Sequence, residues 1–471
     1  MTSVEERSEH DARPRRPPAP ATKRIARWLD RRLGAADFMR SALNKVFPDH
    51  WSFMIGELAL YCFVVLLATG VYLTFFFHPS ATQVIYNGSY APLRGVRMSE
   101  AYQSAVDLSF DVRAGLVMRQ IHHWAALLFL ASIVIHLGRV FFTGAFRRPR
   151  EINWMIGVML LILAIFNGFA GYSLLDDQLS GTGLRIAYSI ALSIPVAGTW
   201  IASLLFGGEF PGPDILTRLY IIHVLLIPAV IVVLLTLHLG IVVRHKHTQF
   251  EGPGREEDNV VGERLWPTYA AKALGLFFLT ASVLCLLGGV AQINPIWIYG
   301  PFNPAEVSSA SQPDWYMGWL DGALRIMPGW EIRAFGYEIP NPFFPAVLLA
   351  GVTFGLLFLW PFLEARVTND HVEHHLCDRP RQRPVRTALG VATLSFYVIC
   401  FLGGASDVLS STFGLSVNAV LWTFRLALFV VPPMAAFTTH RLCRELAARD
   451  GLPIESRVRF REIPARLLGR S

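Results

Sequence analysis

The sequence has few charged residues and few cysteines. Asp, Glu, Lys and Arg make up 16% of its 471 residues, whereas 53% are hydrophobic. This apolar content is more than a soluble core can bury, so an ordinary soluble domain is excluded. The five cysteines form no C-x-x-C-H motif and have no zinc-type spacing. A covalently attached haem and a cysteine-bound iron–sulfur cluster are therefore not expected on this chain, and the cysteines are interpreted as packing residues.

Long apolar segments dominate the rest of the sequence. A helix needs about 20 apolar residues to cross a bilayer. Eight segments meet this requirement, at 55–77, 118–142, 153–174, 219–243, 271–291, 342–363, 387–404 and 418–438. The predicted fold class is therefore all-α, a polytopic membrane protein with eight transmembrane helices. A further apolar segment, 185–206, is interrupted by Pro195 and Gly198 and predicts a pair of helices on the membrane surface.

The positive charges are distributed unevenly between the two sides of these spans. Both ends of the sequence and the connections on their side contain 31 lysines and arginines, whereas the connections on the other side contain 6. Cytoplasmic loops carry the excess of positive charge, so both termini are predicted to be cytoplasmic in a multi-pass protein of the cell membrane. The net charge of +7 follows from this topology, and no nucleic acid is needed as a partner to explain it.

The spans divide the chain into four predicted parts. Residues 1–50 are expected to form a cytoplasmic tail and an amphipathic helix, without the apolar core of a signal peptide. Residues 51–250 form a first bundle of four spans, and residues 251–440 form a second group of four spans with a long outer loop. Residues 441–471 form a basic cytoplasmic tail.

Histidines inside apolar spans are costly and therefore informative. His122 and His136 are 14 residues apart on the second span. His223 and His238 are 15 residues apart on the fourth. At 1.5 Å per residue each helix carries two imidazoles about 21 Å apart on roughly one face. Under the predicted topology, His122 faces His223 near the outer surface and His136 faces His238 near the inner surface. Imidazoles facing each other across a bundle have the geometry of axial haem ligands, so the four predict two b haems.

The histidines also have two alternative interpretations. Buried histidines can be polar packing residues or a proton path in a transporter, which would place them at a midplane cavity. The adjacent His122 and His123 also suggest a haem–copper oxidase core, but such a core needs more spans and more histidines. His123 is rotated by about 100° from His122 and is interpreted as a polar packing residue.

Glycines repeat the spacing of the histidines. Glycine lets a flat ring approach a helix closely, and two pairs spaced by 14 residues lie on the first and third spans: Gly56 with Gly70, and Gly157 with Gly171. Arg119 and Arg218 precede the outer histidines by three and five residues, where a guanidinium can pair with haem propionates. The alternative for both arginines is a cation at a helix end that reaches the membrane surface.

Several strings of residues carry a family resemblance. They are R-x-x-H-H-W at 119–124, H-L-G-R at 136–139, T-R-x-x-x-x-H at 217–223, G-Y-S-L-L-D-D-Q-L-S-G-T-G at 171–183 and H-K-H-T-Q-F at 245–250. Over roughly residues 40–440 the chain resembles the cytochrome b subunit of the quinol:cytochrome c oxidoreductase (cytochrome bc) complex, most of all its actinobacterial form. The resemblance implies that His122 and His223 bind the low-potential haem, and that His136 and His238 bind the high-potential haem.

The resemblance also implies a quinol oxidation site on the outer side. The family motif P-E-W-Y is here Pro313-Asp314-Trp315-Tyr316, in which a shorter acid keeps the carboxylate. Asp314 is the candidate base for a quinol proton, and Tyr316 and Tyr172 are candidates for the same pocket. Asp314 could instead cap the helix that follows it. Leu175 stands where the family pattern leads us to expect proline.

An inner quinone site is implied near the cytoplasmic ends of the first, fourth and fifth spans. Its polar candidates are His245, Lys246, His247 and Lys272, and solvated loop charges explain the first three equally well. Many relatives have an aspartate after the lysine, but this chain has Ala273. Another group must then supply the proton for quinone reduction.

The resemblance finally implies an activity and a set of partners. A quinol, with menaquinol as the expected species, would give one electron to an iron–sulfur partner and the other to the outer haem. The second electron would cross to the inner haem and reduce a quinone, coupled to proton translocation. The expected partners are a Rieske-type iron–sulfur subunit, a cytochrome c subunit, a second copy of the chain in a homodimer and membrane lipid. A terminal oxidase in a supercomplex is a further candidate partner.

Overall fold

The computed structural model describes residues 34–306, 312–334 and 336–452, with single positions between 22 and 32. Residues 1–21 of the predicted N-terminal part and residues 453–471 of the predicted C-terminal tail lie outside the described residues. Within the described part, eight helical segments are long and apolar enough to cross a membrane, which confirms the predicted number. They are Trp51–Thr74, Gly115–Phe142, Glu151–Ser173, Ile215–His245, Leu265–Val290, Phe343–Thr368, Pro384–Gly404 and Val417–Arg449.

The long helices within these segments are α3 (Ile55–Thr74), α5 (Gly115–Phe142), α6 (Glu151–Ser173), α10 (Ile227–His245), α11 (Ala270–Val290), α14 (Leu349–Thr368), α15 (Pro384–Gly404) and α17 (Val417–Arg449). The shorter helices are α2 (Ala35–Leu43), α4 (Glu100–Phe110), α7 (Gln178–Leu192), α8 (Gly198–Phe206), α9 (Ile215–Ile221), α12 (Ile296–Tyr299), α13 (Trp315–Ile326) and α16 (Ser406–Phe413). The fold class is therefore all-α, as the apolar segments predict.

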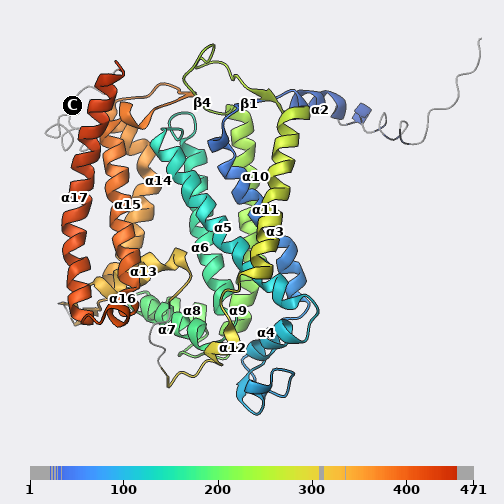
Figure 1. Cartoon of the computed structure of the whole chain (residues 1–471), viewed down its shortest axis with the longest axis vertical. Helices are drawn as coiled ribbons and strands as arrows, with labels where there is room; N and C mark the ends of the chain where they lie inside the picture. Colours follow the sequence, from blue (N-terminus) through green and yellow to red (C-terminus); the bar gives the residue numbers. More distant parts are fainter. Residues whose placement is uncertain are drawn as a thin grey trace, which may run out of the picture.

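Short strands pair at the two ends of the bundle. The antiparallel pairs are β1 (Val46–Phe47) with β5 (Glu263–Arg264), β2 (Gln83–Ile85) with β3 (Arg97–Ser99), and β6 (Ile332–Ala334) with β7 (Tyr337–Ile339). The parallel pair is β4 (Gln249–Phe250) with β8 (Leu376–Cys377). We call the end that carries α2, β1 and β4 the inner end, because the positive charges predict it to face the cytoplasm. The other end, with α4, α7 and α8, is the outer end (Figure 1).

The spans form two groups joined through the middle of the molecule. Helix α5 packs against α3, α11 and α6, and α6 packs against α10. On the other flank α15 packs against α17 and α13, and α14 joins the two groups by packing against α6 (Figure 1). Sequence segment 185–206 forms the predicted pair of helices, as α7 and α8, at the outer end (Figure 1).

The fourth span contains a π-helical turn at Ile222–Leu226, between α9 and α10. Pro228 lies directly after this turn and has no N–H to donate to the residue four positions earlier, which favours a local change of winding. A π turn takes up one extra residue. The 15-residue spacing of His223 and His238 therefore matches, in helical phase, the 14-residue spacing of His122 and His136. Both helices present two imidazoles in nearly the same register.

The last span is longer than its hydropathy predicts. The apolar segment ends near residue 438, but α17 continues without a break to Arg449. The added residues are mostly Leu, Arg, Glu and Ala, which are strong helix formers although they are not apolar as a group. The helix thus leaves the apolar layer and extends at the inner end, into the part predicted as a tail.

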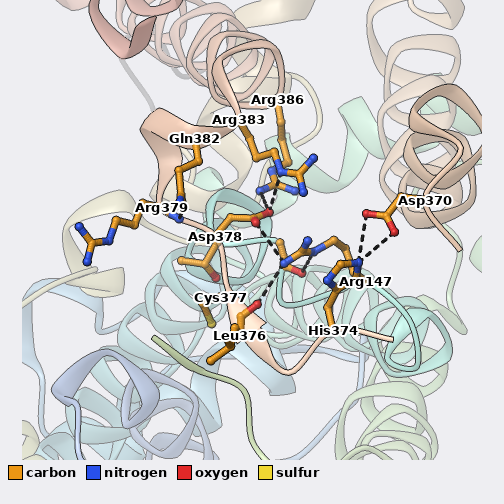
Figure 2. Close-up of polar contacts among 12 residues, drawn as sticks. Arg147, Asp370, His374, Leu376, Cys377, Asp378, Arg379, Gln382, Arg383 and Arg386 are labelled. Atoms are coloured by element: carbon orange, nitrogen blue, oxygen red, sulfur yellow. Dashed lines mark hydrogen bonds and ion pairs between the residues drawn. The ribbon is translucent and has the colours of Figure 1, made fainter. Parts of the chain in front are cut away.

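A buried ion-pair cluster ties the two groups of spans together at the inner end (Figure 2). Asp378 pairs with Arg147 at 3.2 Å and with Arg383 at 3.3 Å, and it also accepts a bond from Arg386. Arg386 is only 3% exposed and pairs with Glu364 at 2.7 Å. Arg147 lies between the second and third spans, whereas the other four residues belong to the sixth and seventh spans and their connection. The cluster therefore joins distant parts of the sequence.

We expect Asp378→Asn to destabilise the protein by about 3 kcal/mol, because it removes the negative charge that Arg147, Arg383 and Arg386 share. Thermal unfolding of the purified protein in detergent measures this loss. The matched control is Asp37→Asn, since Asp37 is 91% exposed and its pair with Arg40 at 3.8 Å should contribute little. Equal stability of the two variants would contradict a stabilising role of the cluster.

The same cluster predicts a loss of stability in acid. Burial alone would raise the pKa of Asp378, but Arg386, Arg147 and Arg383 outweigh burial and lower this pKa. An acid with a lowered pKa in the folded state stabilises that state above its ordinary pKa of about 3.9. This contribution is lost as the pH falls through the folded-state pKa. The difference in stability between the wild type and Asp378→Asn should therefore shrink as the pH falls below about 4.

Candidate functional site

The four histidines of the second and fourth spans form two pairs inside the bundle. At the outer pair, the ring centroids of His122 and His223 are 6.2 Å apart and their planes are inclined by 75°. At the inner pair, His136 and His238 lie close enough to interact electrostatically. The structure thus brings together the partners that the spacing predicts. His122 and His136 lie on α5, His223 lies on the π turn and His238 lies on α10.

Hydrogen bonds define which nitrogen of each outer imidazole carries the proton. The Thr69 hydroxyl donates to the Val65 carbonyl at 2.7 Å, so it accepts at 2.9 Å from Nδ1 of His122. Nδ1 of His223 donates to the Asn167 carbonyl at 2.9 Å. Both rings are therefore neutral Nδ1–H tautomers with Nε2 left as a metal-binding atom. At the inner pair, His238 lies near the backbone of Asn153, which is 14 residues before Asn167. The Nδ1 atoms of His136 and His238 are buried and have no hydrogen-bond partner among the described residues.

Each of the four predicted glycines lies against one imidazole. A Cβ atom at Gly56 would be 3.1 Å from Cε1 of His136, and one at Gly70 would be 3.3 Å from Cε1 of His122. At Gly171 the distance to Cε1 of His223 would be 2.3 Å, and at Gly157 the distance to Cε1 of His238 would be 3.6 Å. The glycines therefore make room first for the imidazoles, because α3 and α6 run directly behind the rings.

A cavity of about 300 Å³ opens beside the outer pair. It is lined by residues of four spans and of α13, among them Gly70, Arg119, His122, Gly171, Tyr172, His223, Asp314 and Tyr316. The outer histidines and the Pro-Asp-Trp-Tyr motif therefore face one space, although about 90 residues separate His223 from Asp314 in the sequence. Leu175 also lines this cavity and packs against the apolar cluster of the outer loop.

Asp314 is held by two neighbours at the edge of this cavity. Nε2 of His123 lies 2.9 Å from one carboxylate oxygen and 3.0 Å from the other, and the Tyr316 hydroxyl donates at 3.2 Å. Asp314 occupies the N-cap position of α13, but its side chain makes no capping hydrogen bond to this described helix. The carboxylate is therefore directed to His123 and the cavity. Burial and the nearby Asp314 raise the pKa of Tyr316 well above its usual value, so its hydroxyl stays protonated.

Tyr172 places a free hydroxyl in the same cavity. Its oxygen is buried and has no hydrogen-bond partner among the described residues. A buried hydroxyl without a partner is costly, so it points to a polar atom of a ligand. The predicted pocket residues Asp314, Tyr316 and Tyr172 therefore meet in one place.

The two predicted propionate partners differ in their surroundings. Arg119 is 6% exposed and donates through one amino group to the Asn294 carbonyl at 3.2 Å. Its Nε and second amino group have no partner in the part of the chain that the structure describes. Buried Asp177 lies near it. Burial raises the pKa of Asp177 to about 6, although Ser180 and Arg119 oppose this shift.

Arg218, in contrast, is directed away from the cavity. It donates to the Ser203 and Leu204 carbonyls at 3.2 and 2.5 Å and lies 3.8 Å from Asp214. These partners belong to α8 and to the residue before α9. The spacing before His223 did not reveal this, because the position of α8 depends on the tertiary fold.

The sequence interpretation missed two residues, His123 and Arg139. His123 was taken as a packing residue, but it contacts Asp314. Arg139 lies one turn after His136, as Arg119 lies one turn before His122. Its Nε atom is buried without a partner from the described ranges, and its guanidinium lies 4.1 Å from the Phe53 ring centroid. The mirrored order R-x-x-H and H-x-x-R could have identified Arg139 from the sequence.

The candidates for the inner site are divided between two places. Nζ of Lys272 pairs with Asp49 at 2.9 Å and with Glu263 at 3.0 Å, at the inner ends of the first and fifth spans. His247 lies nearby, with its ring centroid 4.7 Å from that of Phe47. Burial first, and then nearby Lys45 and Arg150, lower the pKa of His247 to about 4, so it is neutral at pH 7.

The two remaining candidates have different roles. Lys246 donates to the Asp258 carbonyl at 2.9 Å, within the loop that follows α10. His245 ends α10, and its carbonyl accepts at 2.9 Å from Arg150. The structure therefore gathers Lys272 and His247 near the first span, but it does not bring Lys246 to them.

Eight spans with buried histidine pairs at two depths define a b-type cytochrome of the membrane. The comparisons with known proteins agree: residues 127–301 match the family model "Cytochrome b(N-terminal)/b6/petB". The chain belongs to the family of cytochrome b subunits of the cytochrome bc1 complex, and it is therefore a subunit of a quinol:cytochrome c oxidoreductase. Family membership rules out a transporter and a haem–copper oxidase as the source of the histidine pattern.

The relatives are actinobacterial cytochrome bc1 complex cytochrome b subunits. The chain is 52% identical to that of Streptomyces coelicolor over 432 residues, which are 92% of this chain and 79% of the relative. Identity to the subunit of Mycobacterium tuberculosis is 53% over 92% of this chain and 79% of the relative. The fold is similar to a chain of the hyperthermophilic respiratory Complex III, with a TM-score of 0.63 and 20% identity over 88% of this chain and 100% of that one.

The glycines lie at different distances from the imidazoles, so their substitution by alanine should have effects of different size. Gly171→Ala places a methyl group 2.3 Å from the His223 ring and should cost about 1–3 kcal/mol, with loss of the outer b haem. Gly157→Ala places its methyl group at 3.6 Å from His238 and should keep the inner haem. The b-type absorbance per protein measures both. Equal haem loss in the two variants would mean that the glycines make room for the macrocycle and not for the imidazole.

Proposed function

We propose that this chain binds two b haems and carries electrons from a quinol at an outer site to a quinone at an inner site. The observation that carries the proposal is that the outer imidazole pair and Asp314 open on one cavity. An electron acceptor and a proton acceptor are needed at the same place when a quinol is oxidised. The cavity provides both, since His122 and His223 would hold the outer haem beside the Asp314 carboxylate.

The residues present fit the haems. Two opposed rings with centroids 6.2 Å apart leave space for one metal atom between their Nε2 atoms, since a metal–imidazole bond is about 2 Å long. The free donor atoms of Arg119 at the outer pair and of Arg139 at the inner pair suit propionate groups. Arg218 would have to leave the carbonyls of α8 to act in this way. When bound, each haem supplies a one-electron carrier without an open coordination site.

The chain's own residues would then handle the quinol and its proton. Tyr172 offers its free hydroxyl to a quinol oxygen, and the Asp314 carboxylate accepts the proton that leaves it. His123 holds this carboxylate with Nε2 between 2.9 and 3.0 Å from both oxygens, and the Tyr316 hydroxyl restricts it from the other side. Apolar residues of the first span, such as Phe63 and Leu66, line the remaining wall and exclude water.

The finer points of the function rest on the family. We propose menaquinol as the quinol, on the actinobacterial resemblance alone. The other electron requires an acceptor outside this chain, and a Rieske-type iron–sulfur subunit with a cytochrome c subunit fits that need. A homodimer and a supercomplex with a terminal oxidase belong to the same proposal. The excess of positive charge favours a cytoplasmic position for the inner end and both termini, so protons would be released outside.

We expect Asp314→Asn to slow quinol oxidation by about 100-fold, because asparagine cannot accept the proton. The measurement is steady-state quinol:cytochrome c reduction by the whole complex, with the b-haem content checked by absorbance. Asp314→Glu is the matched control, since it restores the family's own acid and should keep most of the activity. Normal turnover of the asparagine variant would reduce Asp314 to a structural role.

A redox titration of the b-type absorbance tests the haem assignment. The wild type should show two components. His136→Ala should remove one of the two components, and His238→Ala should remove that same component, because both imidazoles are needed to hold the inner haem. His123→Ala should keep both components, since His123 contacts Asp314 and not the haem pair. Two components in either inner variant would refute the pairing.

A further inference from the structure

Glu57 is an acidic residue inside the first span that the outer chemistry does not use. One of its carboxylate oxygens accepts from the Tyr61 hydroxyl at 3.0 Å, and the other accepts from the Tyr269 hydroxyl. Tyr61 is one turn further along α3, whereas Tyr269 precedes α11. A carboxylate inside a membrane span is costly, and it points to a function when its hydrogen bonds come from neutral hydroxyls.

Glu57 is also close to the inner histidine pair. Its neighbour Gly56 lies against His136, with 3.1 Å from the position of a Cβ atom to Cε1 of the ring. Successive residues of a helix are rotated by about 100°, so Gly56 faces α5 while Glu57 turns toward α11. The hydrogen bond from Tyr269 confirms this direction. The carboxylate thus lies between the packed helices α3 and α11, next in sequence to the glycine that contacts His136.

The facing side of α11 has an alanine beside its lysine. The family resemblance implies an acid after Lys272, but this chain has Ala273 there. Residue 273 is one helical turn beyond Tyr269, so both side chains lie on the same face of the fifth span. Because the Tyr269 hydroxyl reaches Glu57, position 273 lies on the side of α11 that faces the first span. Glu57 is thus a carboxylate on the first span near this position.

Charged groups lie at the surface of the inner end near this interface. Exposed Lys272 pairs with Asp49 and Glu263, and it follows Tyr269 by three residues. The ring of Phe47 lies between those of Tyr269 and His247, at 4.4 and 4.7 Å. The acids Asp49 and Glu263 can collect protons from water near the residue whose hydroxyl contacts Glu57.

We propose that Glu57 is the proton-donating group of the inner quinone site. The inference rests on the proposed function, which supplies the quinone and the electrons of the inner haem. As an electron reaches the quinone, the O–H bond of the Glu57 carboxyl group breaks and a new O–H bond forms on a quinone oxygen. A second electron and a second proton complete the quinol. The Glu57 carboxylate regains each proton from cytoplasmic water through Tyr269 and the acids at the rim.

A purely structural role makes a different prediction for one variant. If Glu57 only ties α3 to α11, Glu57→Gln should be nearly harmless and the volume is unchanged. The amide oxygen can accept from one tyrosine hydroxyl, and the amide NH2 can donate to the hydroxyl oxygen of the other. If Glu57 donates protons, the same variant should fail, because an amide cannot give up a proton. Glu57→Asp keeps a titratable group and should retain most of the function.

The experiment follows reoxidation of the inner haem in the intact complex. The complex is reduced chemically and mixed without oxygen with a short-tailed menaquinone, and the loss of the reduced b-type band of the inner haem is recorded. We expect Glu57→Gln to slow this reaction by about 100-fold and Glu57→Asp by less than about 10-fold. Glu445→Gln, an exposed glutamate on α17, is the matched control and should react as the wild type. A redox titration must show both haems in each variant.

The outcomes separate this inference from the proposed function. Wild-type reoxidation in Glu57→Gln with both haems present would overturn the role of Glu57 and leave the proposed function intact. A wild-type complex without b-type bands, or with bands that quinone does not reoxidise, would instead overturn the proposed function.

A second measurement keeps the inference testable if Glu57→Gln does not assemble. In the wild type, infrared difference spectra of quinone reduction should contain a carboxyl C=O band that changes as Glu57 loses and regains its proton. Tyr269→Phe removes one hydrogen bond to this carboxyl group and should shift the band. The absence of any band that responds to Tyr269→Phe would overturn the proposal.

Discussion

The structure depends on the way in which imidazoles are held inside a medium that offers no hydrogen bonds. Lipid cannot satisfy a buried nitrogen, and the protein supplies the partners of the outer rings. Thr69 and the Asn167 carbonyl take the Nδ1 protons of the outer pair, and this choice leaves both Nε2 atoms free of protons. These hydrogen bonds would hold the two rings ready for the outer haem.

The helices around the histidines share one register because of this constraint. Glycines at 14-residue intervals on α3 and α6 let the backbone run directly behind the rings of α5 and of the fourth span. The fourth span has an interval of 15, and its π turn at Ile222–Leu226 absorbs the extra residue. Four helices therefore repeat the same arrangement at two depths, which is what two carriers in series across a membrane require.

The two ends of the bundle combine this common arrangement with different acids. At the outer end, Asp314 comes from the N-terminus of α13, beyond the first bundle, and is held by His123 of α5. At the inner end, Glu57 lies within α3 and is held by two tyrosine hydroxyls. Under the proposed function, Asp314 would accept a proton at the outer site and Glu57 would donate one at the inner site. The buried cluster around Asp378 fixes the second group of spans against the first (Figure 2).

The sequence alone determined the eight spans, the pairing of the histidines and the glycine spacing, because hydropathy and helical periodicity are local properties of the chain. It did not determine the contact of His123 with Asp314, the direction of Arg218 toward α8 or the π turn at His223, since these depend on how distant segments pack. Ala273 appeared in the sequence only as a missing acid. Only the tertiary structure brought Glu57 to Tyr269 on the facing span, because a contact between two helices belongs to neither helix by itself.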